Sequence, residues 1–104
     1  MKQDKLVKIL YEYDIVPELH DTYFSFVTSE LVPQLNSVGL ELAEVWETVY
    51  GDYPQRLITF VAPDMQTVND ALHNERFLKM EKKLLRYVKN YSRRIVKYKP
   101  HFQF

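Results

Sequence analysis

The stretch KLVKILYEYDI, residues 5–15, decides the fold. It alternates from one residue to the next: one set of side chains is Val7, Ile9, Tyr11, Tyr13 and Ile15, and the opposite set is Lys8, Leu10, Glu12 and Asp14. A period of two over this length predicts a β-strand with one strongly apolar face. Pro17 follows the strand and is expected to end it.

A helix is predicted next, because apolar residues recur every three or four positions: Phe24, Val27, Leu31, Leu35 and Val38. Gly39 stands where a left-handed C-terminal cap belongs. Pro33 lies inside the window and lacks a backbone N–H, so it should bend or shorten the helix.

Residues 41–50 alternate again, 51–54 have turn chemistry, and 56–62 are rich in β-branched and aromatic residues, which together predict a hairpin. Asp64 is a suitable N-cap for a second helix over residues 65–89. The apolar stripe of that helix shifts near His73 and Asn74, so a break is expected there. The last predicted element is a short strand over residues 93–99.

The resulting order, βαββαβ in one domain over residues 1–104, predicts an α+β fold of the ferredoxin-like type. Its antiparallel sheet has the strand order 4-1-3-2, with both helices on one face. The other face would carry an apolar set that is rarely left to water: Leu10, Trp46, Ile58 or Phe60, Val96 and Tyr98. A second sheet from an identical chain would cover it, so we expect a homodimer.

Composition excludes several classes of protein. The chain is 46% hydrophobic and 27% charged, which is incompatible with wholesale disorder, and it has no cysteine for disulfides or thiolate metal sites. Its two glycines exclude a glycine-rich phosphate loop. The longest apolar runs are too short to cross a membrane, and charges near the start do not fit a signal peptide, so we expect a cytoplasmic protein.

The charges are segregated along the chain. Residues 1–75 have a net charge of −9 and residues 76–99 a net charge of +9. The favoured interpretation is that the basic segment meets acidic groups such as Glu41, Glu44, Glu47 and Asp52 within the chain or in a second copy. An anionic ligand is the next alternative, and nucleic acid is the least expected partner.

The chain resembles the dimeric α+β barrel superfamily, and within it NIPSNAP-type domains. The resemblance rests on the element order, on Tyr11-Glu12-Tyr13 running toward Pro17, and on Glu-Val-Trp-Glu-Thr-Val-Tyr-Gly at residues 44–51. It implies two ferredoxin-like subunits packed sheet to sheet around a barrel. Relatives in that superfamily include cofactor-independent monooxygenases, isomerases and heme proteins.

The sequence departs from several of these relatives. The first strand has no Asn of the kind that the cofactor-independent monooxygenases pair with Trp and His, and the hairpin turn lacks the Asn common in NIPSNAP-type domains. His20, His73 and His101 share no metal-ligand spacing, and none is placed as a heme ligand. We therefore expect no cofactor and no metal.

The candidate site residues lie on the strands of the predicted sheet. Trp46, Thr48 and Tyr50 share one side of their strand, and facing a cavity they would suit a flat aromatic ligand; facing the helices or a partner subunit, they would be packing residues. Glu12 in a dry cavity would hold a proton tightly enough to act as a general base. Alternatively, Arg93 or Arg94 would form a salt bridge with it.

Two residues complete the candidate set. Arg94 would contact an acidic ligand if it faces the cavity, and His73 could turn inward at the helix break. The first hypothesis is a homodimeric barrel that binds a small apolar or aromatic metabolite, with oxygenase or isomerase chemistry through Glu12 or His73. The alternative is a non-catalytic dimerisation module whose barrel is filled by side chains.

Overall fold

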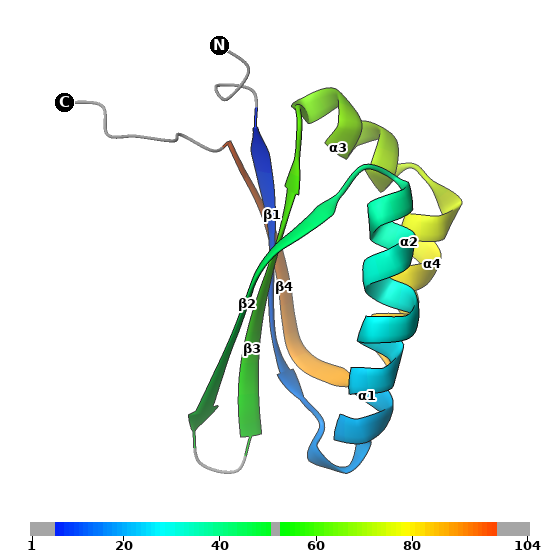
Figure 1. Ribbon diagram of the computed structural model, residues 1–104. Coiled ribbons are helices and arrows are strands. Elements are labelled where there is room, and N and C mark those ends of the chain that lie inside the picture. The colour runs from blue at the N-terminus through cyan, green and yellow to red at the C-terminus, as the bar shows by residue number, and fades with distance from the viewer. Residues whose placement is uncertain (1–5, 51–52, 98–104) are drawn as a thin grey trace, which may run out of the picture.

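A single four-stranded antiparallel sheet carries the helices on one of its faces (Figure 1). The computed structural model describes residues 6–50 and 53–97. The strands are β1 (Val7–Ile15), β2 (Glu41–Tyr50), β3 (Tyr53–Ala62) and β4 (Val88–Lys97), and they lie in the order β2-β3-β1-β4. This is the predicted order 4-1-3-2 viewed from the other edge, so the ferredoxin-like α+β fold is confirmed.

The helical layer covers the face that we call the inner face. Its segments are a 3-10 turn (Pro17–Leu19), α1 (His20–Phe26), a π-helical segment (Val27–Leu31), α2 (Val32–Ser37), α3 (Met65–Leu72) and α4 (Glu75–Leu84). Among the described residues, no helix has both the length and the apolar character needed to cross a membrane.

The alternation of β1 is confirmed by burial. Its inward side chains are all buried in the core between sheet and helices: Val7, Ile9, Tyr11, Tyr13 and Ile15. The residues between them are half-buried on the opposite face. The strand with the clearest alternation in the sequence therefore contributes five side chains to the core.

The first helical stretch differs from the prediction at its start. Phe24 is 54% exposed, whereas Tyr23 and Phe26 are buried beside Val27. Tyr23 takes the inward position because its hydroxyl is hydrogen-bonded at 2.6 Å to the hydroxyl of buried Tyr13. A buried polar group needs such a partner, and this one selects which ring faces the sheet.

The predicted helix ends and interruptions are largely confirmed. Pro33 lies in the first turn of α2, directly after the π-helical segment, so the regular helix is interrupted there. Gly39 has φ = 95°, the left-handed conformation expected of a cap. Asp64 caps α3 by accepting a hydrogen bond from the Thr67 backbone N–H at 2.8 Å. The predicted break separates α3 from α4, and Asn74 caps α4.

Two predicted boundaries are wrong. The second helix ends at Leu84, not at residue 89, and β4 begins at Val88, not at residue 93. The chain turns early because Val88 pairs with Ile15 and Lys89 pairs with Asp14, which extends the ladder along β1. The left-handed Asn90, with φ = 56°, accommodates the shift in register that follows.

The prediction that Ile58 or Phe60 lies on the uncovered face is also wrong. Ile58 pairs with Tyr11 and Phe60 pairs with Ile9, and directly paired residues of an antiparallel sheet point to the same face. Both are therefore in the core, where they are buried. Leu57, Thr59 and Val61 occupy the other face instead.

Candidate functional site

The sheet face without helices, which we call the outer face, gathers most of the candidate residues. Strand register places them in rows that run across the sheet from β2 through β3 and β1 to β4. Three rows matter here: Trp46, Leu57, Glu12 and Ser92; Glu44, Thr59, Leu10 and Arg94; and Thr48, Gln55 and Asp14.

Apolar side chains form a patch on this face. Trp46 is 61% exposed and pairs with Leu57, and Val96 at the opposite edge is 44% exposed. Leu10, Leu57 and Val61 lie between them and are half-buried. An exposed indole beside several aliphatic side chains is characteristic of an interaction surface, because water solvates such a patch poorly.

Glu12 lies near the middle of the outer face. It is half-buried, with Leu57 opposite it on β3 and Ser92 opposite it on β4. The described residues form no hydrogen bond or ion pair with its carboxylate. Arg94 is exposed one row away, opposite Leu10, and the described part of the chain gives it no ion pair either.

Arg93, the other predicted partner for Glu12, belongs to the inner face. Its guanidinium donates a 2.5 Å hydrogen bond to Glu81 on α4, and it lies over the ring of Phe77. Glu81 also accepts a hydrogen bond from the Tyr91 hydroxyl. The predicted salt bridge through Arg93 is therefore wrong, because alternation along β4 directs Arg93 toward α4.

The remaining candidates are dispersed. Thr48 shares the outer face with Trp46, whereas the side chain of Tyr50 lies outside the described residues. His73 is exposed at the end of α3, where its Nδ1 lies 2.8 Å from the Asn69 carbonyl oxygen. The structure thus brings Glu12, Trp46, Thr48 and Arg94 to one face and separates His73 from them.

No cluster of three or more potential metal ligands occurs among the described residues.

Sequence reasoning missed a polar cluster on the inner face. Arg56 is 9% exposed, donates a 2.9 Å hydrogen bond to Glu47, and lies over the Tyr23 ring. Its Nε is buried without a hydrogen-bond partner in the described structure. The alternation of the two strands could have predicted this pair. Arg56 is two residues from inward Ile58, and Glu47 is two residues from Val45, so both side chains point to the inner face.

Tyrosines accompany this cluster and are held in their neutral form. Burial raises the pKa of Tyr13 and of Tyr11 above the ordinary 10.0. Burial also raises the pKa of Tyr91, and the hydrogen bond that its hydroxyl donates to Glu81 raises it further. The inner face is thus a packed core in which Tyr13 pairs with Tyr23 and Arg56 with Glu47, and the outer face is the surface available to a ligand or partner.

Comparison with known proteins identifies the fold. No family model matches the chain, and no curated protein matches it. Among solved structures, a NIPSNAP family protein from Agrobacterium tumefaciens has a TM-score of 0.65 at 15% identity, covering 92% of this chain and 88% of its own.

Two solved structures with other names have the same architecture. A protein from Bacteroides thetaiotaomicron assigned to antibiotic biosynthesis monooxygenases has a TM-score of 0.66 at 14% identity, covering 96% of this chain and 93% of its own. The hydroxynitrile lyase of Passiflora edulis has a TM-score of 0.70 at 8% identity, covering 96% and 99%. At these identities the similarity establishes the fold. This chain therefore has the same fold as these NIPSNAP, monooxygenase-named and hydroxynitrile lyase structures.

Proposed function

We propose that two copies of this chain pack outer face to outer face and that the space between their sheets binds a small apolar or aromatic molecule. The observation that carries this proposal is the patch around Trp46, which is 61% exposed on a face that no helix of residues 6–50 and 53–97 covers. Covering such a patch removes apolar surface from water, the main driving force for association.

Charge on the outer face supports pairing with an identical copy. Glu41 and Glu44 lie at the β2 edge, whereas Arg94 lies at the β4 edge. A two-fold axis parallel to the strands would set the β2 edge of one copy against the β4 edge of the other. Glu44 and Arg94 are the two ends of one row, so each would then meet the opposite charge on the second copy.

The residues within the interface indicate the class of ligand. The indole of Trp46 offers a flat apolar surface with one N–H donor, and Thr48 adds a hydroxyl on the same side of β2. Arg94 would attract an acidic group on the ligand. Tyr50 stays a predicted contact, because it continues the alternation of Trp46 and Thr48 along β2. A small aromatic or apolar acid fits this combination.

Glu12 is the residue through which such a site would carry out chemistry. Enclosed between two sheets, its carboxylate would be positioned to accept a proton from an acidic C–H or O–H of the ligand. An isomerisation needs only such a proton transfer, whereas an oxygenation also needs dioxygen as its oxidant. The similarity in fold to the hydroxynitrile lyase supports a catalytic role for this architecture. We assign the proton transfer to Glu12 rather than to His73, because His73 lies at the end of α3 in the helical layer.

Native mass spectrometry of the untagged protein tests both halves of the proposal. We expect a mass of twice the chain's 12.5 kDa, together with a retained small molecule. Trp46→Ala should lose the retained molecule. Phe24→Ala, which removes an aromatic ring of similar exposure from the helical layer, should keep it.

The outcomes separate the two hypotheses. A dimer that retains nothing in wild type, and whose interface leaves no cavity, would favour the non-catalytic dimerisation module. A mass of a single chain at high micromolar concentration would overturn the proposal as a whole.

A further inference from the structure

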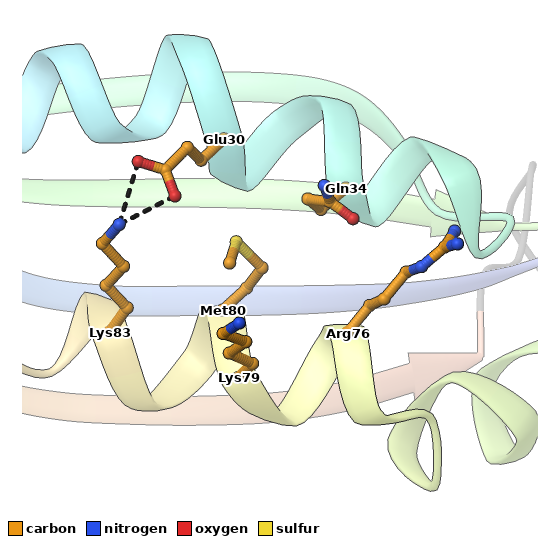
Figure 2. Close-up of a pocket in the computed structure, with 6 residues that line it drawn as sticks. All are labelled: Glu30, Gln34, Arg76, Lys79, Met80 and Lys83. Carbon is orange, nitrogen blue, oxygen red and sulfur yellow. Dashed lines mark hydrogen bonds and ion pairs between the residues drawn. The ribbon is translucent and has the colours of Figure 1, made fainter.

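The helical layer contains a groove between the π-helical segment with α2 on one side and α4 on the other. Its volume is about 330 Å³, and Figure 2 shows the six side chains that line it: Glu30, Gln34, Arg76, Lys79, Met80 and Lys83. This volume is at the lower end of the range for small-molecule sites. The groove lies on the opposite layer from the outer face and is independent of the site proposed above.

Three cations line one side of this groove. Arg76, Lys79 and Lys83 are spaced three and four residues apart, so they share one face of α4. Like charges at this spacing repel each other and weaken a helix slightly. Negative charge in the groove would therefore reduce the repulsion among these three cations.

Glu30 compensates only one of the three. Its two carboxylate oxygens accept hydrogen bonds from the Lys83 ammonium at 2.8 and 2.9 Å (Figure 2). The same ammonium lies over the Phe26 ring. Lys83 is thus fixed at one end of the groove. The lining retains a net charge of +2 from Arg76 and Lys79.

Neither of these two cations has an acidic partner in the described structure. Arg76 extends toward α2 at the other end of the groove, where its Nη1 reaches only the Ser37 hydroxyl at 3.5 Å, the limit of a hydrogen bond. Asp70 lies with Arg76 around a smaller adjoining hollow, but its carboxylate accepts a hydrogen bond from Gln66. No ion pair to Lys79 is formed within the described residues.

From this arrangement we infer that the groove binds the phosphoryl group of a small molecule, with Arg76 and Lys79 as its ligands. A guanidinium matches a phosphate with parallel N–H donors, and an adjacent ammonium adds a point charge. A phosphate monoester carries a charge of about −1.5 to −2 at neutral pH, which balances the groove. Gln34 adds an amide donor, and Met80 gives the groove an apolar floor.

The test is a titration with inorganic phosphate and with glycerol 2-phosphate, followed by backbone amide shifts in NMR at constant ionic strength. We expect saturable shifts at Gln34, Lys79 and Met80 for both probes, and much weaker ones for acetate. Arg76→Gln and Lys79→Gln should each weaken phosphate binding by about tenfold, the effect of losing one charge-assisted hydrogen bond.

Lys82→Gln is the matched control, because it removes the same charge from α4 outside the groove. It should change the affinity by less than about twofold, as expected for a surface charge that does not line the groove. Glu30→Gln should tighten binding, since it leaves Lys83 without its carboxylate.

Shifts that never saturate, acetate binding equal to that of phosphate, or an equal loss in Lys82→Gln would overturn the inference. The oligomeric state of the protein plays no part in this titration. Failure here would therefore leave the proposed sheet-to-sheet dimer standing.

Discussion

At the scale of single residues, the inner face shows that paired polar groups can replace apolar ones in a small core. Tyr13 and Tyr23 satisfy each other's hydroxyls, and the guanidinium of Arg56 lies over the Tyr23 ring while it bonds to Glu47. Each group is tolerated because its partner is present. Removing both partners should therefore cost less than the sum of the losses from removing each one alone.

The first prediction tests this coupling between the two tyrosines. Tyr13→Phe or Tyr23→Phe alone should lower the free energy of unfolding by about 1–2 kcal/mol, because the remaining hydroxyl is left buried without its partner. The double variant should lose less than the sum of the two. Urea unfolding of all four proteins measures the coupling, with Tyr87→Phe as a control that should lose less than about 0.5 kcal/mol. Additive losses would show that the hydroxyl pair is unimportant.

The second prediction concerns alkaline pH. The pKa values of Tyr11, Tyr13 and Tyr91 are raised in the folded chain above the ordinary 10.0, first of all by burial. Stability from such groups is fully present below pH 10 and is lost as pH rises further, because the unfolded chain releases protons that the folded chain retains.

Each of these tyrosines should contribute up to about 1.4 kcal/mol of destabilisation per pH unit above that point. Urea unfolding from pH 8 to 11.5 measures the slope, and Tyr13→Phe should reduce it. A slope that Tyr13→Phe leaves unchanged would contradict the role given to burial of this hydroxyl.

At the scale of elements, the turn from α2 into β2 depends on one glycine. Gly39 adopts φ = 95°, and a Cβ at this position would lie 2.6 Å from Cγ2 of Thr67 on α3. Both the backbone conformation and the close approach of α3 therefore require glycine.

The third prediction separates these two causes. Gly39→Ala should destabilise the protein by more than about 1–2 kcal/mol, the cost of the left-handed conformation alone, because the contact with Thr67 adds to it. Thr67→Ser removes Cγ2 but keeps the hydroxyl that bonds to Asp64. In the Thr67→Ser background, thermal unfolding should show a smaller loss for Gly39→Ala. An equal loss in both backgrounds would mean that the contact has no energetic effect.

The same scale shows what could be predicted from the sequence. The alternation of β1, the cap at Gly39, the break before α4 and the strand order were all predictable, because each is encoded by local periodicity or by one special residue. The exposure of Phe24 was not, because only the tertiary contact between Tyr13 and Tyr23 decides which ring turns inward. The early start of β4 likewise depends on pairing with β1.

The candidate site was predictable only in part, for a related reason. Alternation grouped Trp46 with Thr48 on one side of their strand and left open whether that side met the helices. Strand register places both on the outer face with Glu12. His73 was a candidate because it lies at a helix break. A break in the sequence pattern does not indicate whether the side chain there faces the sheet or the solvent. The groove residues of α4 gave no signal beyond a run of basic charge, since the facing helix is more than 40 positions away in the sequence.

At the scale of the whole molecule, one layer of helices leaves half of the sheet surface uncovered. The outer face combines an apolar patch with opposite charges at its two edges, Glu44 at β2 and Arg94 at β4. A face that is both apolar and self-complementary in charge is suited to a second copy of itself.

The fourth prediction tests that complementarity. Glu44→Arg and Arg94→Glu should each weaken the dimer by about tenfold or more, because each sets like charges against one another across the interface. The variant that carries both changes should recover much of the affinity, since the pair is restored with reversed sign. Sedimentation velocity over a range of concentrations measures the three dissociation constants. Losses that accumulate in the double variant would show that these two residues do not meet.

The most direct test of the account uses Trp46, the chain's single tryptophan, as a reporter on the outer face. Its indole is 61% exposed in the single chain, so packing of a second sheet over it should protect its fluorescence from quenching by acrylamide. We predict protection at micromolar concentrations, and full accessibility on dilution or in Leu57→Arg, where a charge is placed beside the indole. A tryptophan that is equally quenched in wild type and Leu57→Arg at every concentration would contradict the claim that the outer face is covered by a second copy.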